Sequence, residues 1–372
     1  MTVLTSPEQV TATYLTDRLR ENDHMDRGEV VAVGIEDKLK DDRETYRLKI
    51  DYSLDASADL PWKLIFKYNT NGCKKTRAPH YCAAVREALF YEEIVATMPD
   101  PPVAQCYDTG VDFDTGEAYT LVEDLSGRYY VTPASATPSP YGGWHNFDNL
   151  PAEQFGQIVA ALARIQAYWW DHERLGEQTF SESTGDMLSM VDTASEEWVE
   201  DRLHRPEGKG EVARDLRYHG ESDAEGALAL SERAMRAWPA LCRRRLEAGK
   251  GLTFMHVDFH LRNVLLPRDP ETHGVSIHDW EGLARGVGVT DLAHLLATSM
   301  LPAPYWRALE EPLLARYHAA LVAGGVEGYS LDDCRDDYRL SLVALMPQAF
   351  GGGPFHRSVL SAFRAWDCEE LL

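Results

Sequence analysis

The sequence of 372 residues has few basic side chains for its length: 37 Lys and Arg stand against 60 Asp and Glu, a formal net charge of −23. So acidic a surface repels phosphate backbones and anionic lipid headgroups, which argues against nucleic-acid and membrane-surface partners. No apolar run reaches membrane-spanning length, and the first residues lack the basic and apolar regions of a secretory signal. We therefore expect a cytoplasmic protein.

Cysteines are also few, and the six of them include no C-x-x-C pair. Neither their number nor their spacing indicates a disulfide scaffold, so buried thiols in a reducing compartment are expected. Polar low-complexity tracts and internal repeats are absent, and hydrophobic residues make up 44% of the chain. Such a composition excludes wholesale disorder. The length predicts two packed lobes.

The first part of the chain predicts a small lobe built on an antiparallel sheet. Short runs with alternating apolar residues are separated by polar loops, the pattern of consecutive strands in one sheet. A helix is expected before them at 6–21, and a second at 80–98, ended by a cluster of prolines. The expected strands are 30–35, 45–52, 62–68, one near Ala104, and 118–122.

The remainder of the chain predicts a mostly helical lobe. Residues 126–151 contain four prolines and several Gly, Ser and Thr, so they are interpreted as a loop or a crossing between lobes. The expected helices are 152–171, 188–203, 224–248, 290–300, 303–323, 331–350 and 355–366. Two segments of strand character, 253–266 and 275–280, interrupt them.

A pattern of polar residues in these two strand segments carries the main functional signal. Asp258 is followed five residues later by Asn263, and Asp279 ends the next short strand. Phosphoryl transfer needs a carboxylate near the attacking hydroxyl and oxygen ligands for Mg²⁺, so these residue types suit a kinase catalytic loop and metal-binding strand. A plain β-turn would explain Asp258 and Asn263, but not the apolar flanks or Asp279.

A kinase also needs a lysine on the third strand of its first lobe and a glutamate on the following helix. Lys67 ends an apolar strand, and Glu87 lies on the expected helix. Lys63 is a rival for the lysine, and Glu92 and Glu93 are rivals for the glutamate. Surface lysines and helix glutamates are ordinarily solvated, so this pair has weight only together with the catalytic loop.

Taken in order, these motifs resemble those of the aminoglycoside phosphotransferase and choline kinase superfamily, and in particular its ecdysteroid-kinase-like branch. The resemblance spans most of the chain. It implies an α+β, bilobal protein-kinase-like fold, with a small antiparallel-sheet N-lobe over 1–124 and a larger, mostly helical C-lobe over 125–372. The supporting segments are Tyr46-Arg47-Leu48-Lys49-Ile50, Arg86-Glu87-Ala88-Leu89-Phe90-Tyr91, Leu121-Val122-Glu123-Asp124-Leu125, Leu162-Ala163-Arg164-Ile165-Gln166-Ala167, and Gly288 with Asp291 and Leu292.

The resemblance implies ATP and Mg²⁺ as cofactors and a role for each motif residue. Asp258 would be the catalytic base or would orient the attacking hydroxyl, and Asn263 and Asp279 would bind Mg²⁺. Lys67 would bind the nucleotide phosphates, and Glu87 would position Lys67.

Three further roles follow from the same resemblance. The backbone at the expected interlobe hinge, Glu123, Asp124 and Leu125, would bind adenine. Asp291 would anchor the catalytic loop through backbone hydrogen bonds, and His256 would brace that loop.

Two departures from the branch are visible. The turn Leu39-Lys40-Asp41-Asp42-Arg43-Glu44 has no glycine where a phosphate-binding loop is expected, which puts nucleotide affinity or loop geometry in doubt. Gln166 replaces a helix histidine and could keep a hydrogen bond but not a charge. Neither change removes the proposed base or a proposed metal ligand.

The spacing favours a small-molecule hydroxyl acceptor over a protein. Only eleven residues separate Asp279 from Asp291, and no A-P-E motif occurs, which leaves no room for a typical activation segment. Residues 171–201 hold ten Asp or Glu and one Arg, and could attract a cationic acceptor or form a solvated acidic face. Neighbouring aromatics, such as Trp169 and Trp170, would equally suit an apolar acceptor or a core.

We therefore predict an ATP- and Mg²⁺-dependent kinase that transfers the γ-phosphate to a hydroxyl of a small molecule, such as an antibiotic, amino-alcohol, sugar or sterol-like metabolite. The alternative is a nucleotide-binding pseudokinase that acts as a scaffold or regulator, which the glycine-free turn would favour. The intact set of Asp258, Asn263 and Asp279 favours the enzyme.

Overall fold

The structure, a computed structural model, describes residues 3–39, 44–69, 83–131, 150–176, 196–205, 208–299, 303–350 and 353–372. The chain forms two compact units. The sheet unit contains the described residues of Met1–Tyr130 and Leu266–Leu283. The helical unit contains those of Val131–Glu177, Gly185–Leu265 and Ala284–Leu372. The strand that follows the predicted catalytic loop therefore carries the chain back into the sheet unit.

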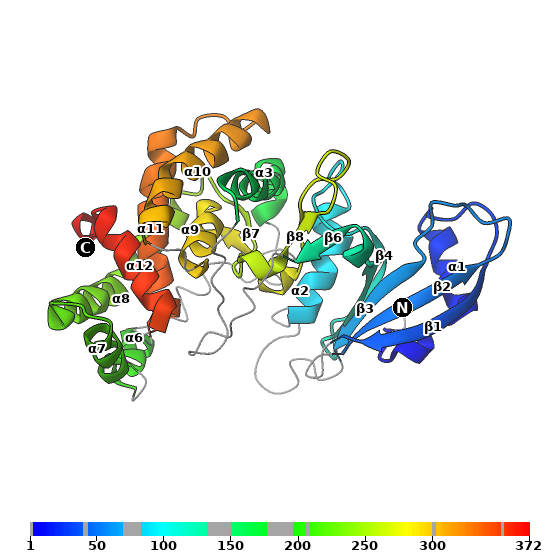
Figure 1. The fold of residues 1–372 in the computed structure, drawn as a ribbon, viewed down its shortest axis with the longest axis horizontal. Coiled ribbons are helices and arrows are strands. Elements are labelled where there is room, and N and C mark those ends of the chain that lie inside the picture. Colours follow the sequence, from blue (N-terminus) through cyan, green and yellow to red (C-terminus); the bar gives the residue numbers. More distant parts are fainter. Residues whose placement is uncertain are drawn as a thin grey trace. The chain divides into compact units, whose positions relative to one another are not determined.

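The sheet unit is built on a five-stranded antiparallel sheet in the order β1-β2-β3-β5-β4 (Figure 1). Leu48, Leu64, Phe66 and Leu121 are fully buried on one face of it, where Leu15 and Leu19 of helix α1 pack against them. Its strands are β1 (Val30–Lys38), β2 (Thr45–Tyr52), β3 (Lys63–Asn69), β4 (Cys106–Asp112) and β5 (Glu117–Glu123). The prediction of an antiparallel sheet is confirmed.

The beginning of the chain differs from the predicted single helix over 6–21. A short 3-10 turn at Pro7–Gln9 is followed by α1 (Ala12–Glu21). The Thr11 side chain accepts a hydrogen bond from the Tyr14 backbone N–H, so Thr11 caps a new helix rather than continuing an earlier one. The predicted strand near Ala104 is also displaced, because β4 begins at Cys106.

The opposite face of the sheet contacts the second helix of this unit. Helix α2 (Ala83–Leu89) continues as a π-helical turn over Phe90–Val95, inside the predicted helix 80–98. Val85, Ala88 and Leu89 pack against Ala118 of β5. Residues 80–82 of that prediction lie outside the described residues. The sheet is therefore covered by α1 on one face and by α2 on the other.

The helical unit is dominated by α-helices, as predicted. In Figure 1, α3 lies beside α10, and α11 contacts both α8 and α12. The helices are α3 (Ala152–Tyr168), α6 (Glu196–His204), α7 (Lys209–Tyr218), α8 (Ala224–Glu247), α9 (Val289–Thr298), α10 (Ala303–Ala323), α11 (Leu331–Ala349) and α12 (Gly353–Ala365). An antiparallel sheet in one unit and mostly helices in the other confirm the predicted α+β class.

Helix α7 was not anticipated, because its Gly and charged residues weaken the apolar periodicity that marks a helix. Val212, Ala213 and Leu216 are nevertheless buried in it. Several predictions lie partly outside the described residues: 40–43 of the turn at 39–44, 132–149 of the loop at 126–151, and the part of the acidic stretch and of helix 188–203 that spans 177–195.

Short strands flank the predicted catalytic loop. In the helical unit, β7 (Thr253–Met255) pairs with β10 (Ala284–Gly286). A three-stranded sheet contains β6 (Tyr129–Val131), β8 (Val264–Pro267) and β9 (Ser276–Ile277), in the order β6-β8-β9. The loop between β7 and β8 holds Asp258 and Asn263, and the end of β9 leads directly to Asp279.

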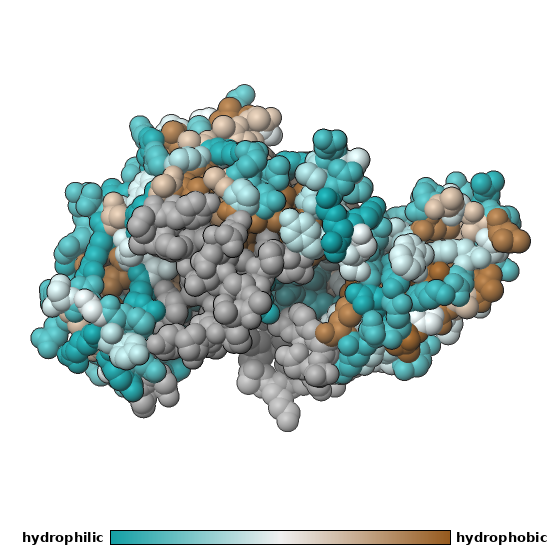
Figure 2. All heavy atoms as spheres, in the orientation of Figure 1, coloured by the Kyte–Doolittle hydropathy of each residue, from teal (hydrophilic) through white to brown (hydrophobic). Residues whose placement is uncertain are grey.

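The exposed surface is mainly polar. Figure 2 shows mostly hydrophilic atoms, with brown apolar atoms scattered over the sheet unit. Exposed apolar side chains of that unit include Val31, Ile35, Leu54 and Trp62. Among the described residues, no helix is long and apolar enough to cross a membrane.

Candidate active site

Lys67 lies near the end of β3. Side chains alternate between the two faces of a strand, and Leu64 and Phe66 are buried on the face that α1 covers, so Lys67 lies on the opposite face. Its Nζ lies 2.7 Å from Oε2 of Glu87 and 2.7 Å from Oδ1 of Asp279. A third carboxylate oxygen, Oε2 of Glu281, lies 3.6 Å away. These residues, which all belong to the sheet unit, are called the lysine cluster below.

The lysine cluster contains more carboxylates than positively charged groups, because one ammonium faces three carboxylates. Burial alone would lower the pKa of Lys67, but Glu87, Asp279 and Glu281 together raise it above its ordinary value. Burial raises the pKa of Glu87, and the Lys67 charge opposes that shift. The excess of carboxylate makes the cluster a favourable place for an additional cation.

The turn that holds Asp279 is fixed by an aromatic contact with the end of α2. The Trp280 ring stacks on Phe90 with centroids 4.1 Å apart and an interplanar angle of 10°. Both rings are fully buried. Asp279 itself has a φ of +66°, a conformation that Asp adopts more readily than most residues. The stack therefore holds Asp279 against the helix that carries Glu87.

The rival residues have other partners. Lys63 lies on the same face of β3 but pairs with Glu36 of β1, 2.5 Å away. Glu92 and Glu93 lie in the π-helical turn, and burial raises the pKa of Glu92. Neither glutamate is among the acids around Lys67. The pair that the structure brings together is Lys67 with Glu87.

The predicted hinge follows β5. Glu123 is the last residue of that strand and pairs with Arg128 at 2.5 Å, while Leu125 is buried. The Asp124 side chain accepts a hydrogen bond from the Ser126 N–H and another from Arg47 Nε at 2.6 Å. Burial alone would raise the pKa of Asp124, but these hydrogen bonds hold it below its usual range.

The Arg47 side chain connects the predicted hinge with strand β1. Besides Asp124 it binds Asp37, with Nη1 3.0 Å from Oδ2. In the strand register it lies directly opposite Ile65, two residues before Lys67. The face that carries Lys67 therefore also carries a second, separate ionic group near the hinge.

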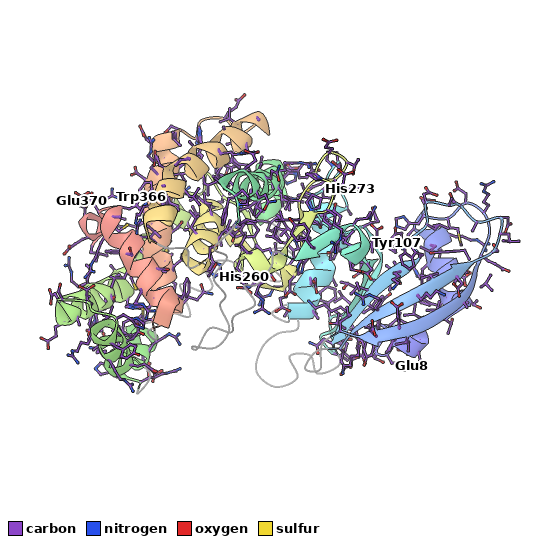
Figure 3. The ribbon with its side chains drawn as sticks, in the orientation of Figure 1. Glu8, Tyr107, His260, His273, Trp366 and Glu370 are labelled. Carbon is purple, nitrogen blue, oxygen red and sulfur yellow. The ribbon has the colours of Figure 1, made fainter. Side chains whose placement is uncertain are left out.

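The predicted catalytic loop belongs to the helical unit and lies between β7 and β8. The Asn263 side chain donates from Nδ2 to the Asp258 carbonyl oxygen at 2.9 Å, which closes the loop on itself. His260, labelled in Figure 3, is mostly buried and places Nε2 3.4 Å from Oδ2 of Asp258. The hydrogen bond from His260 holds the pKa of Asp258 below its usual range.

A buried carboxylate at the start of α9 holds the first residues of this loop. Asp291 accepts hydrogen bonds from the backbone N–H groups of His256, at 2.7 Å, and Val257, at 2.9 Å. Gln166 donates a third from Nε2 at 3.0 Å, and its Oε1 accepts one from the Tyr317 hydroxyl. Burial raises the pKa of Asp291 to about 7, and the N–H donors oppose that shift.

Each unit, taken by itself, contains oxygen atoms of the kind that Mg²⁺ prefers. Mg²⁺ prefers oxygen ligands and is often bound by one or two carboxylates together with substrate phosphates. Asp279 and Glu281 supply carboxylates, and the Nδ2 hydrogen bond of Asn263 leaves its Oδ1 as an acceptor. In the described part of the chain, no three His, Cys, Asp or Glu side chains form a metal site by themselves.

Two residues of the site were missed from the sequence. Glu281 contributes the third carboxylate of the lysine cluster, and its position two residues after Asp279 was the available signal. His260 contacts Asp258, and its position two residues after that aspartate places both in one loop. Neither spacing is specific enough to be recognised without the three-dimensional contacts.

The sequence establishes the family. Residues 75–329 match the phosphotransferase enzyme family, so the chain belongs to that family. The matched range contains Glu87, Asp258, Asn263 and Asp279, whereas Lys67 precedes it. The prediction of a phosphotransferase is thereby confirmed. No protein of curated function matches the chain.

Solved structures with a similar arrangement are distant in sequence. A microcompartment-associated aminopropanol kinase is 14% identical, with a TM-score of 0.46 and coverage of 96% of this chain and 95% of its own. Choline kinase LicA from Streptococcus pneumoniae is 12% identical, with a TM-score of 0.43 and coverage of 91% and 93%. An aminoglycoside-3'-phosphotransferase of type VIII is 20% identical, with a TM-score of 0.37 and coverage of 88% and 97%.

Proposed function

We propose that the protein is an ATP- and Mg²⁺-dependent kinase that phosphorylates a hydroxyl group of a small molecule. The observation that carries the proposal is the lysine cluster, in which Lys67 is held by Glu87 on one side and Asp279 on the other. A structural ion pair would need only one of these acids. A lysine held beside an excess of carboxylate is the arrangement that a magnesium-bound phosphate group can complete.

Each residue of the proposed reaction has a defined task. Asp258 accepts the proton of the acceptor hydroxyl at its carboxylate, which the lowered pKa keeps ionised. Lys67 binds phosphate oxygens and Glu87 orients Lys67, while the hinge backbone at Glu123–Leu125 binds the base. ATP would supply the transferred phosphoryl group, and Mg²⁺, bound by Asp279 and Asn263, would offset its negative charge.

The proposal defines the phosphoryl acceptor only by its chemical class, a small molecule with a free hydroxyl group. We test the reaction by ATP consumption with Mg²⁺ across aminoglycosides, choline-like amines, other amino-alcohols, sugars, nucleosides and sterols. Asp258→Asn should reduce turnover at least about 100-fold, the usual contribution of a general base. The exposed Asp269, changed to Asn, is the matched control and should keep full activity.

A second measurement separates an enzyme from a nucleotide-binding scaffold. ATP with Mg²⁺ should raise the melting temperature of the wild type, and Asp279→Ala should abolish the part of the shift that depends on Mg²⁺. Binding without turnover of any acceptor would favour the scaffold. Failure to bind nucleotide at all would refute the proposed kinase.

A further inference from the structure

A cavity in the helical unit lies apart from the residues of the proposed reaction. Its volume is about 530 Å³, the size of a site for a small organic ligand. Helices α7, α10 and α12 and the turn after α7 form it. The lining residues are Leu216, His219, Gly220, Glu221, Arg307, Arg357, Leu360, Ser361, Arg364 and Ala365.

Basic side chains are concentrated in this cavity, although the protein as a whole is strongly acidic. Three arginines line it against one glutamate. Arg357 and Arg307 pair with Asp215 and Glu310, which do not line the cavity, and Arg364 pairs with Glu221, which does. The side chains that face the cavity are therefore mostly basic, and each guanidinium charge is balanced by one carboxylate partner.

The ion pairs leave hydrogen-bonding capacity unused. Among the described residues, Arg357 bonds through Nη1 alone and Arg364 also through Nη1 alone. A guanidinium has five N–H donors, and its planar fork binds carboxylate and phosphate groups in a bidentate manner. The two side chains are 26% and 41% exposed, so the remaining donors are accessible.

The cavity is separate from the catalytic loop because it lies on the other side of α12. Its five lining residues on that helix follow helical spacing from Arg357 to Ala365, which places them on one face. Phe355, on the opposite face, packs against His294 with centroids 5.7 Å apart. His294 in turn bonds the Phe259 carbonyl oxygen of the loop at 3.0 Å. The loop and the cavity thus use different faces of the same helix.

We propose that this cavity binds a small organic anion, with its carboxylate or phosphate group on Arg357 and Arg364 and its apolar body beside Ala365. Ion pairs that only join helices do not require a cavity beside them, whereas an anion-binding site requires both basic side chains and space for the ligand.

The experiment measures binding to the full-length protein by calorimetry, without nucleotide or acceptor. The probes are phenyl phosphate and benzoate, which combine an anionic group with an apolar ring, inorganic phosphate, which has no ring, and benzyl alcohol, which has no charge. At least one of the two aromatic anions should bind more tightly than inorganic phosphate, and benzyl alcohol should not bind. The tighter of the two identifies the preferred anionic group.

Two variants test the location. Arg364→Gln removes an exposed guanidinium and should weaken binding roughly tenfold or more, the value of a charge-assisted hydrogen bond. Ala365→Leu fills the cavity without touching an ion pair and should also weaken binding. Their matched controls, Arg335→Gln on α11 and Ala229→Leu on α8, alter similar exposed helix positions outside the cavity and should bind like the wild type.

The proposal is overturned if no aromatic anion binds, if inorganic phosphate binds as tightly as the aromatic anions, or if both cavity variants bind like the wild type. Unchanged circular dichroism and melting temperature of the variants exclude misfolding as the cause of lost binding. Asp258→Asn should leave anion binding intact, so failure of the proposed kinase reaction and failure of this site are distinguishable.

Discussion

The two aspartates proposed for the reaction are held in opposite ways. Asp279, in the sheet unit, is held by charge, because it faces Lys67 together with Glu87 and Glu281. Asp258, in the helical unit, is held by its backbone, because the buried Asp291 binds the N–H groups of the two residues before it. An electrostatic cluster responds strongly to an added cation, whereas a loop held by hydrogen bonds responds less. This difference suggests that the metal-binding part is adjustable and the catalytic loop is preset.

The largest effect should come from removing the only cation identified in the lysine cluster. Lys67→Met leaves Glu87 and its neighbouring acids without their counter-charge, which should cost about 3–5 kcal/mol of unfolding free energy. Denaturant titration measures the loss. Added Mg²⁺ should restore stability more in this variant than in the wild type, since the metal can replace the missing positive charge.

Lys63→Met, on the same strand, is the matched control. Its partner Glu36 is substantially exposed, so this change should cost no more than about 1 kcal/mol. If Mg²⁺ stabilises both variants equally, the lysine cluster is not where the metal binds.

The helical unit should respond mainly to the loss of its anchor, and less to metal than the lysine cluster does, because Asn263 is the one metal ligand proposed there. Asp291→Asn keeps one carbonyl oxygen but turns an N–H donor toward one of the two backbone N–H groups. One buried donor is then unsatisfied, which should cost about 1–3 kcal/mol. Asp336→Asn, on the exposed face of α11, should change stability by less than about 0.5 kcal/mol. If added Mg²⁺ restored the stability of the Asp291 variant, the two regions would not differ in their response to metal.

A smaller effect is expected at Val257, where the anchored backbone has a φ of +72°. A β-branched residue there is strained by about 1–2 kcal/mol, and Asp291 holds it in place through the Val257 N–H. Val257→Gly relieves the strain but increases the entropy of the unfolded chain, so stability should stay within about 1 kcal/mol of the wild type. Val264→Gly, at the buried start of β8, should cost about 2–4 kcal/mol. If Val257→Gly and Val264→Gly lowered the free energy of unfolding equally, Val257 would not be strained.

The smallest effect concerns the pH at which Asp258 becomes protonated. The hydrogen bond from His260 holds the pKa of Asp258 below its usual range, so the carboxylate stays ionised as the pH falls further than for an ordinary aspartate. His260→Gln should move this titration upward, because the carboxylate loses the hydrogen bond that favours its ionised form. Carboxyl ¹³C NMR measures the shift, and His219→Gln, outside the loop, should leave it unchanged. A downward shift would show that His260 does not stabilise the carboxylate.

The sequence was sufficient to predict the strands and helices that have a regular apolar pattern and clear boundary residues. Alternating residues in 45–52 and 62–68 predicted β2 and β3 because each strand has one face in the core. The helix over 6–21 was divided because Thr11 can cap a helix, a possibility that apolar spacing does not reveal. Helix α7 was missed because only three of its residues are buried.

The choice between candidate residues depended on which face of an element each side chain occupies. The apolar run before Lys67 favoured it over Lys63, and Lys67 is the lysine that lies beside Glu87. Glu281 could not be recognised in this way, since an acid two residues after an aspartate is common on any surface. Its relevance comes from Lys67, more than two hundred positions earlier in the chain.

What the sequence by itself determined is the family, the α+β architecture and the residue types available for phosphoryl transfer, because short-range spacing and periodicity carry that information. What only the tertiary structure decided is how those residues are held. The lysine cluster, the anchoring of His256 and Val257 by Asp291, and the arginine-lined cavity all join distant segments. Such contacts depend on how helices and strands pack, and packing is not encoded in the spacing of any single segment.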